Sequence, residues 1–221
     1  MSTTKLSVKQ GWEMVEKVVA EHLDELEDAP THRELYAFAV SHELNTKSLF
    51  PKFKTVLKKH GVSYTELRSA TRAADAQALA AAAESAPELA LFAAGYDAGE
   101  EGSYAVCDSS GQPVWFGAFH ASDSDFTPGD EESADVAAAK KAIWLAGKAR
   151  EEVDGQALNL VLTVSRPGMD NDVLTAAATR AKLALTLEIS DDNPAIDQCQ
   201  EPGFKTWREV NLAHLVEEGQ Q

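Results

Sequence analysis

The stretch LFAAGYDAGEEGSYAVCDSSG, residues 91–111, marks the point at which the chain changes from helical to extended periodicity. Residues 88–96 and 103–107 are apolar runs of strand length, separated by an acidic, glycine-containing loop. A third extended run, residues 114–120, follows the turn at residues 108–111. Together they predict an antiparallel meander of three strands.

Helical and extended segments alternate after the meander. The segment GDEESADVAAAKKAIWLA, residues 129–146, predicts a helix that opens on acids, and residues 170–183 predict another helix. Residues 157–165 and 183–190 predict strands. Asn193 and Pro194 predict the cap and first turn of a further helix, followed by a helical tail at residues 207–218. The order predicts a mixed five-stranded sheet flanked by helices.

This order of elements resembles the ribonuclease H-like superfamily, and residues 91–111 are similar to the first hairpin of that family. The resemblance implies the family fold and, in its nucleases, four carboxylates that hold two divalent metal ions. In ESADVAAA, Asp135 matches the acid of the family's first helix, and in NPAIDQC, Asp197 matches the acid of its final helix. Ala94 and Val164 stand where the family has the aspartates of its first and fourth strands.

Two of the four acids are therefore missing, and the resemblance implies a degenerate member with no cofactor and no hydrolytic site. Asp97 replaces the first-strand acid only if a loop corrects the alternation of side chains along the strand. A nuclease remains an alternative, with Asp97, Asp135 and Asp197 as catalytic residues and Mg²⁺ or Mn²⁺ on their oxygens. Asp135 also has a structural explanation, because an acid near a helix start offsets the helix dipole.

The first third of the chain has helical periodicity. Four helices are predicted, at residues 8–28, 31–42, 48–60 and 63–86, and Thr31 with Glu34 predicts a capping box on the second. The tight link at residues 44–47 makes the middle pair helix-turn-helix-like. The predicted domains are a helical bundle at residues 1–84 and an acidic ribonuclease H-like domain at residues 88–221.

Charge separates the two regions. The whole net charge of −16 comes from the residues after residue 75, because residues 1–75 contain 11 basic and 11 acidic side chains, which balance. Within them, residues 45–72 carry seven Lys and Arg against one Glu. This predicts contact with DNA or RNA through Asn45, Thr46, Lys47, Lys52, Lys54, Lys58 and Lys59. A solvated helix face explains the same run of charge.

No apolar run approaches the roughly 18 residues of a membrane span, and the N-terminus lacks a secretory signal. With two distant cysteines, Cys107 and Cys199, the sequence predicts a cytoplasmic protein with buried thiols and no membrane partner. Three functions stay open. They are a nucleic-acid-binding protein whose non-catalytic ribonuclease H-like domain mediates interaction, a metal-dependent nuclease, and a protein–protein adaptor that uses the acidic surface without binding nucleic acid.

Overall fold

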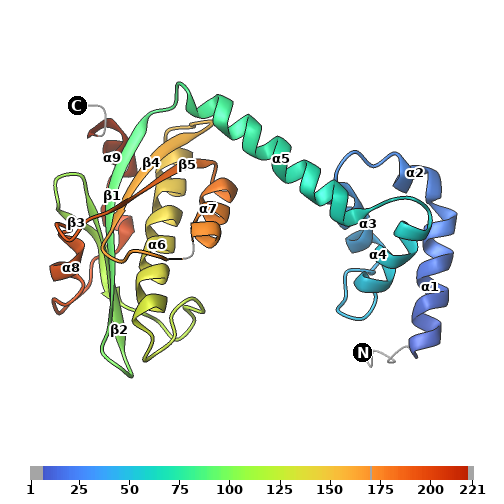
Figure 1. The fold of residues 1–221 in the computed structure, drawn as a ribbon, viewed down its shortest axis with the longest axis horizontal. Coiled ribbons are helices and arrows are strands. Elements are labelled where there is room, and N and C mark those ends of the chain that lie inside the picture. The colour runs from blue at the N-terminus through green and yellow to red at the C-terminus, as the bar shows by residue number, and fades with distance from the viewer. Residues whose placement is uncertain (1–6, 170, 219–221) are drawn as a thin grey trace. The chain divides into compact units, whose positions relative to one another are not determined.

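The computed structural model describes residues 7–169 and 171–218 and is an α+β protein (Figure 1). Its contacts divide the chain into two compact units, Met1–Asp75 and Ala76–Gln221, and the helix α5 (Tyr64–Ala83) contributes to both. The domain ranges 1–84 and 88–221 stay predictions, and their outer ends, residue 1 and residue 221, lie outside the described residues. Over the described ranges, none of the helices has the length and apolar composition that crossing a bilayer requires.

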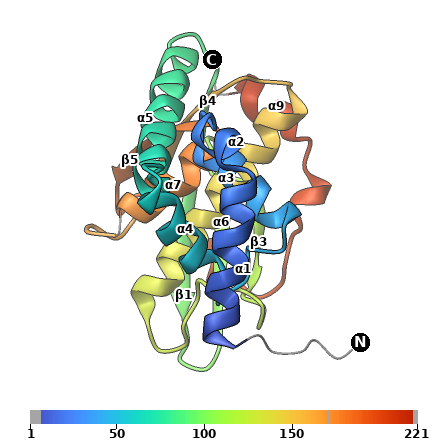
Figure 2. The ribbon, with the colours of Figure 1, turned by 90° about the vertical axis from the view of Figure 1, so that its right-hand side faces the viewer.

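The N-terminal unit is a helical bundle, seen from a second side in Figure 2. Before α5 it contains α1 (Val8–Glu21), α2 (Leu23–Glu27), α3 (His32–Ser41) and α4 (Phe50–Lys59). The amphipathic helices α1 and α4 pack against each other. Buried apolar side chains from all four helices form one core, with Val15, Leu26, Leu35 and Phe53 among them.

Two local predictions in this unit differ from the structure. The helix predicted at residues 8–28 is interrupted at His22, whose backbone leaves the helical region at φ −125°. The sequence has no proline or glycine there, and the His22 ring instead packs edge-on against Phe38 and His42. Thr31 is the N-cap of α3, but its hydroxyl bonds the Glu34 carboxylate and makes no capping bond to the helix backbone.

The C-terminal unit is built on the predicted mixed five-stranded sheet. Its strands are β1 (Glu88–Asp97), β2 (Gly102–Asp108), β3 (Pro113–Ala118), β4 (Leu158–Val164) and β5 (Leu183–Ile189). Their order is β3-β2-β1-β4-β5, with the first three strands antiparallel and β1, β4 and β5 parallel. The predicted three-stranded meander is therefore confirmed.

Helices cover both faces of the sheet (Figure 1). On one face lie α6 (Glu131–Glu152), α7 (Asn171–Arg180) and α9 (Leu212–Glu218), and on the other lies the short α8 (Ala195–Gln198). The predicted tail at residues 207–218 is not one helix. A 3₁₀ turn, η1 (Trp207–Glu209), precedes α9 and packs Trp207 against Trp144 of α6.

Alternation along β1 separates the two cores. Leu89, Leu91 and Ala93 face α6, whereas Ala94 faces α8. The alanine-rich α6 lies close to β1, because small side chains allow a short distance between helix and sheet. This close approach determines the surroundings of Asp135.

Candidate functional site

Asp135 lies in the second turn of α6, pointing at the end of β1. The helix begins after Asp130, whose side chain caps it by accepting a hydrogen bond from the backbone N–H of Ser133. Asp135 is only 8% exposed, and its Oδ1 accepts a hydrogen bond of 3.1 Å from the backbone N–H of Gly95. Its other oxygen, Oδ2, accepts one of 2.7 Å from Nε of Arg166. Both oxygens of the carboxylate therefore have a donor.

Gly95 allows this arrangement because it has no side chain. A Cβ atom built there would lie 2.2 Å from the backbone carbon and oxygen of Ala134 and 2.7 Å from the backbone nitrogen of Asp135. These are helix backbone atoms, which cannot rotate away as a flexible side chain can. A glycine at position 95 is thus required for β1 to pack against α6.

Arg166 follows β4 and carries the cation of this site. Its Nη2 also donates to Oε2 of Glu131 at 3.0 Å, so one guanidinium holds two carboxylates of α6. The hydrogen bond to Asp135 and, after it, the one to Glu131 raise the pKa of Arg166 above its ordinary value. The planar guanidinium is suited to carboxylates and stays charged at every accessible pH.

The remaining positions of the implied nuclease site have different surroundings. Ala94 packs on the α8 face, and Val164 lies in the core under α6. The Asp97 carboxylate accepts the backbone N–H of Gly99 at 2.9 Å within the β1–β2 loop, and Asp197 is exposed on α8. No group of three metal-ligating side chains occurs among residues 7–169 and 171–218.

A two-metal site would need several carboxylate oxygens converging on the ions. Here the first and fourth strands supply methyl groups, and the oxygens of Asp135 already bind an N–H and a guanidinium. The residues present do not fit such a metal pair.

The α8 face of the sheet contains both cysteines. Cys107 of β2 and Cys199, directly after α8, are buried in one cluster with Ala94 and Ala195, so the prediction of buried thiols is confirmed. Burial foremost raises the pKa of Cys107 to about 12 and that of Cys199 to about 11. The thiols are therefore protonated and suited to packing rather than to nucleophilic attack.

The structure separates the predicted basic residues into three groups. Lys52 and Lys59 turn toward α1, with Nζ atoms 5.8 and 5.7 Å from the Trp12 ring, and Lys59 pairs with Glu16 at 3.2 Å. Lys54 points the other way, 5.3 Å from the Phe50 ring. The sequence predicts a single contact surface for these lysines, which the structure divides.

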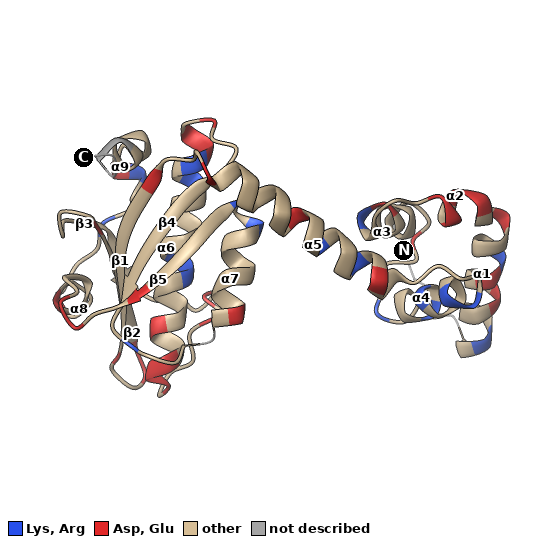
Figure 3. Ribbon diagram, turned by 45° about the horizontal axis from the view of Figure 1, so that its top comes forward, with Lys and Arg blue, Asp and Glu red and all other residues tan. Residues whose placement is uncertain are grey.

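The third group comprises Asn45, Thr46, Lys47 and Lys58. Asn45, Lys47 and Lys58 are exposed, and within the described part of the chain neither lysine has a carboxylate partner. Thr46 is exposed but its hydroxyl accepts the backbone N–H of Leu49 at 3.2 Å, which orders the turn before α4. Figure 3 shows Lys and Arg along α4, in contrast with the Asp and Glu of α2.

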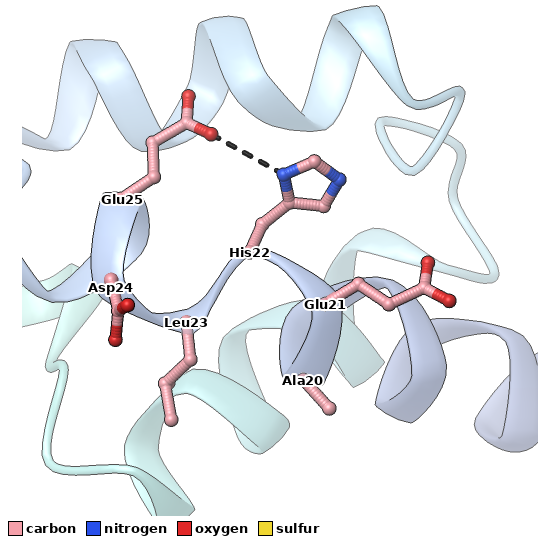
Figure 4. A pocket seen from close by; sticks show the side chains of 6 residues that line it. All are labelled: Ala20, Glu21, His22, Leu23, Asp24 and Glu25. Carbon is pink, nitrogen blue, oxygen red and sulfur yellow. Dashed lines mark ion pairs between the residues drawn. The ribbon is translucent and has the colours of Figure 1, made fainter.

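A hollow of about 250 Å³ lies at the junction of α1 and α2 (Figure 4). Its lining includes Glu21, Asp24 and Glu25, and His22 Nδ1 lies 3.4 Å from the Glu25 carboxylate. Three acids in so small a space repel an anion, so this hollow is no part of a surface for nucleic acid.

Two features were missed by sequence reasoning. The partner of Asp135, Arg166, is 31 residues away and follows a different strand, and no local pattern joins them. Aromatic residues with a cation four positions later, Phe50 with Lys54 and Tyr64 with Arg68, carry a local signal, because such pairs share one side of a helix.

No protein-family model matches the chain, and no curated protein is significantly similar to it in sequence.

Proposed function

We propose that the protein binds nucleic acid through its N-terminal unit and that its C-terminal unit is a ribonuclease H-like domain without catalytic activity. The single observation that supports binding is the exposed pair Lys47 and Lys58, which no carboxylate of the described residues neutralises. Lys47 lies at the helix-turn-helix-like link and Lys58 in the last turn of α4, and both are suited to contact phosphate oxygens.

The fold part of the proposal is supported by the sheet. An antiparallel meander extended by two parallel strands, with helices on both faces, is consistent with the resemblance seen in the sequence. The loss of catalysis is supported by the Asp135–Arg166 ion pair, because the guanidinium occupies the oxygen that a metal ion would need.

Binding is tested by fluorescence anisotropy of labelled DNA and RNA oligonucleotides with the full-length protein. We expect the double variant Lys47→Glu, Lys58→Glu to raise Kd about tenfold or more and to reduce the slope of log K against log salt by about 2. The matched control is Lys9→Glu, Lys17→Glu on α1, which changes the net charge equally at two lysines already paired with acids.

An equal loss in both double variants would show that only net charge acts, and would reject α4 as the contact. The same oligonucleotides incubated with Mg²⁺ or Mn²⁺ are expected to stay intact. Cleavage that disappears in Asp135→Asn would establish the nuclease alternative instead.

A further inference from the structure

Three aromatic rings from three helices meet on one side of the N-terminal unit. The Phe50 ring of α4 is contacted edge-on by Tyr36 of α3 and Tyr64 of α5, with centroid distances of 5.5 and 5.4 Å and interplanar angles of 87°. Tyr36 is 46% exposed, and Phe50 and Tyr64 are half-buried. The unit thus places aromatic surface in contact with solvent at the edge of its core, against which Phe50 and Tyr64 pack.

Cations surround these rings. Lys54 Nζ lies 5.3 Å from the Phe50 centroid and 5.9 Å from the Tyr64 centroid. Arg68 and Arg72 follow Tyr64 at intervals of four residues, which places all three on one side of α5. We name Tyr36, Phe50, Lys54, Tyr64, Arg68 and Arg72 the aromatic-basic surface.

A histidine of α3, His32, lies next to these rings and is influenced by the arginines of α5. His32 of α3 packs edge-on against Tyr64 at 5.7 Å, and its Nδ1 is buried without a hydrogen-bond partner in the described structure. Burial, followed by Arg33, Arg68 and Arg72, lowers the pKa of His32. The arginines of α5 are therefore close enough to act on α3. Asp75, the carboxylate that acts on the same ring, is paired with Arg33.

A surface of partly exposed rings and of cations that have no acidic partner among the described residues suits a ligand with planar groups on an anionic chain. Single-stranded nucleic acid has this chemistry, because its bases present their faces for stacking beside regularly spaced phosphates. A duplex presents phosphates as well, but its base faces are stacked within the helix and only their edges are accessible.

The outward side of α4 is poorly equipped to read base edges. The exposed residues of α4 are Pro51, Thr55, Lys58 and Lys59, of which Lys59 is paired with Glu16 of α1. The Thr55 hydroxyl donates to the Pro51 carbonyl at 2.9 Å. Lys52, which could extend from the same helix, donates to the Ser48 carbonyl at 2.6 Å. Direct readout in a major groove relies mainly on Arg, Lys, Asn and Gln, and of these the outward side of α4 offers only lysine.

We propose that the aromatic-basic surface is a binding site for single-stranded nucleic acid, on which bases stack against Tyr36 and Tyr64 while Lys54, Arg68 and Arg72 hold the phosphates. The proposal rests on the proposed function and names its ligand class. Lys47 and Lys58 add charge to the same polyanion from the same unit.

The test measures anisotropy of one labelled sequence in three forms, single-stranded DNA, single-stranded RNA and duplex DNA, with the full-length protein. We expect Tyr36→Ala and Arg68→Gln each to weaken single-strand binding about tenfold, the size of one stacking or phosphate contact, and to change duplex binding less than about twofold. Tyr36→Phe should bind as the wild type does, because stacking needs the ring and not its hydroxyl.

Matched controls come from the C-terminal unit. Tyr96 is a tyrosine with a similar exposed fraction, 43%, and Arg180 is an exposed arginine of α7, so Tyr96→Ala and Arg180→Gln should leave binding unchanged. Thermal denaturation followed by circular dichroism checks that Tyr36→Ala stays folded, and Arg68→Gln tests the same surface at an exposed position.

The outcomes separate the two proposals. Single-strand binding that is unaffected by Tyr36→Ala and Arg68→Gln but lost in Lys47→Glu, Lys58→Glu would overturn this inference and leave the proposed function standing. Equal losses for single strand and duplex in Tyr36→Ala would also overturn it. A wild-type protein that binds none of the three oligonucleotides would overturn both.

Discussion

The backbone N–H of Gly95 at the end of β1 donates a hydrogen bond of 3.1 Å to Oδ1 of Asp135 in α6, 40 residues later in the sequence. This bond joins the sheet to the helix that packs on it. With Arg166 on the second oxygen, the carboxylate has a structural role that explains its burial.

The close contact at Gly95 predicts a severe effect of one methyl group. Gly95→Ala should lower the free energy of unfolding by about 3 kcal/mol or more, because the new Cβ meets helix backbone at 2.2 Å. Gly147→Ala in α6 is the control. There the nearest atom is the Ala181 methyl at 3.1 Å, and the gain in helix propensity offsets part of the strain, leaving a change within about 1 kcal/mol. Urea denaturation measures both, and equal values would contradict the backbone clash.

The ion pair predicts coupling between Asp135 and Arg166. Arg166→Met leaves a nearly buried carboxylate without its cation and should cost about 2 kcal/mol, less than a fully buried pair because the Arg166 side chain is 36% exposed. Asp135→Asn should retain the bond from Gly95 while losing the charge. In a double-mutant cycle by urea denaturation we expect a coupling of about 1–2 kcal/mol, and additive effects would show that the pair is energetically unimportant.

The same pair predicts a weak response to divalent ions. Calorimetric titration of Mn²⁺ into the full-length protein should give no saturable heat that depends on Asp135, since the guanidinium of Arg166 competes for its oxygen. Asp135→Asn is the comparison. Saturable Mn²⁺ binding in the wild type that disappears in this variant would show that Asp135 binds metal, contrary to this prediction.

The buried thiols predict slow chemical modification. At pH 8, well below pKa values of about 12 for Cys107 and about 11 for Cys199, few thiolates form in the folded protein. Reaction with Ellman's reagent should therefore be about a hundredfold or more slower than for free cysteine. Both thiols should react promptly in guanidinium chloride. Fast labelling of the native protein would mean that the cluster around Cys107 opens readily.

His32 predicts a pH dependence of stability. Its folded pKa lies below the ordinary 6.5, so between these two values the unfolded chain binds the proton and the folded chain does not. Stability is consequently lost as pH falls through 6.5 toward the folded pKa. His32→Gln should show a smaller decrease in the free energy of unfolding between pH 7.5 and 5.5 than the wild type. A slope in His32→Gln identical to that of the wild type would contradict the assignment.

Regular periodicity predicted most elements correctly. The apolar runs that became β1, β2, β4 and β5 and the long α6 follow from local pattern, because alternation and helical spacing depend only on near neighbours. Thr31 was recognised as a cap, but its hydrogen bond depends on a side-chain rotamer that pattern does not encode. The break at His22 also escaped prediction, since it accompanies packing against Phe38 and His42.

Site residues divide in the same way. Residue types along the chain are enough to place Lys47 and Lys58 on a basic segment and to show that Ala94 and Val164 have no carboxylate, because charge and ligand chemistry belong to each side chain. Tertiary structure alone decided that Arg166 reaches Asp135, that Lys52 and Lys59 turn to Trp12, and that Tyr36, Phe50 and Tyr64 meet. Such contacts join separate elements, and their distances depend on how helices and strands pack rather than on spacing along the chain.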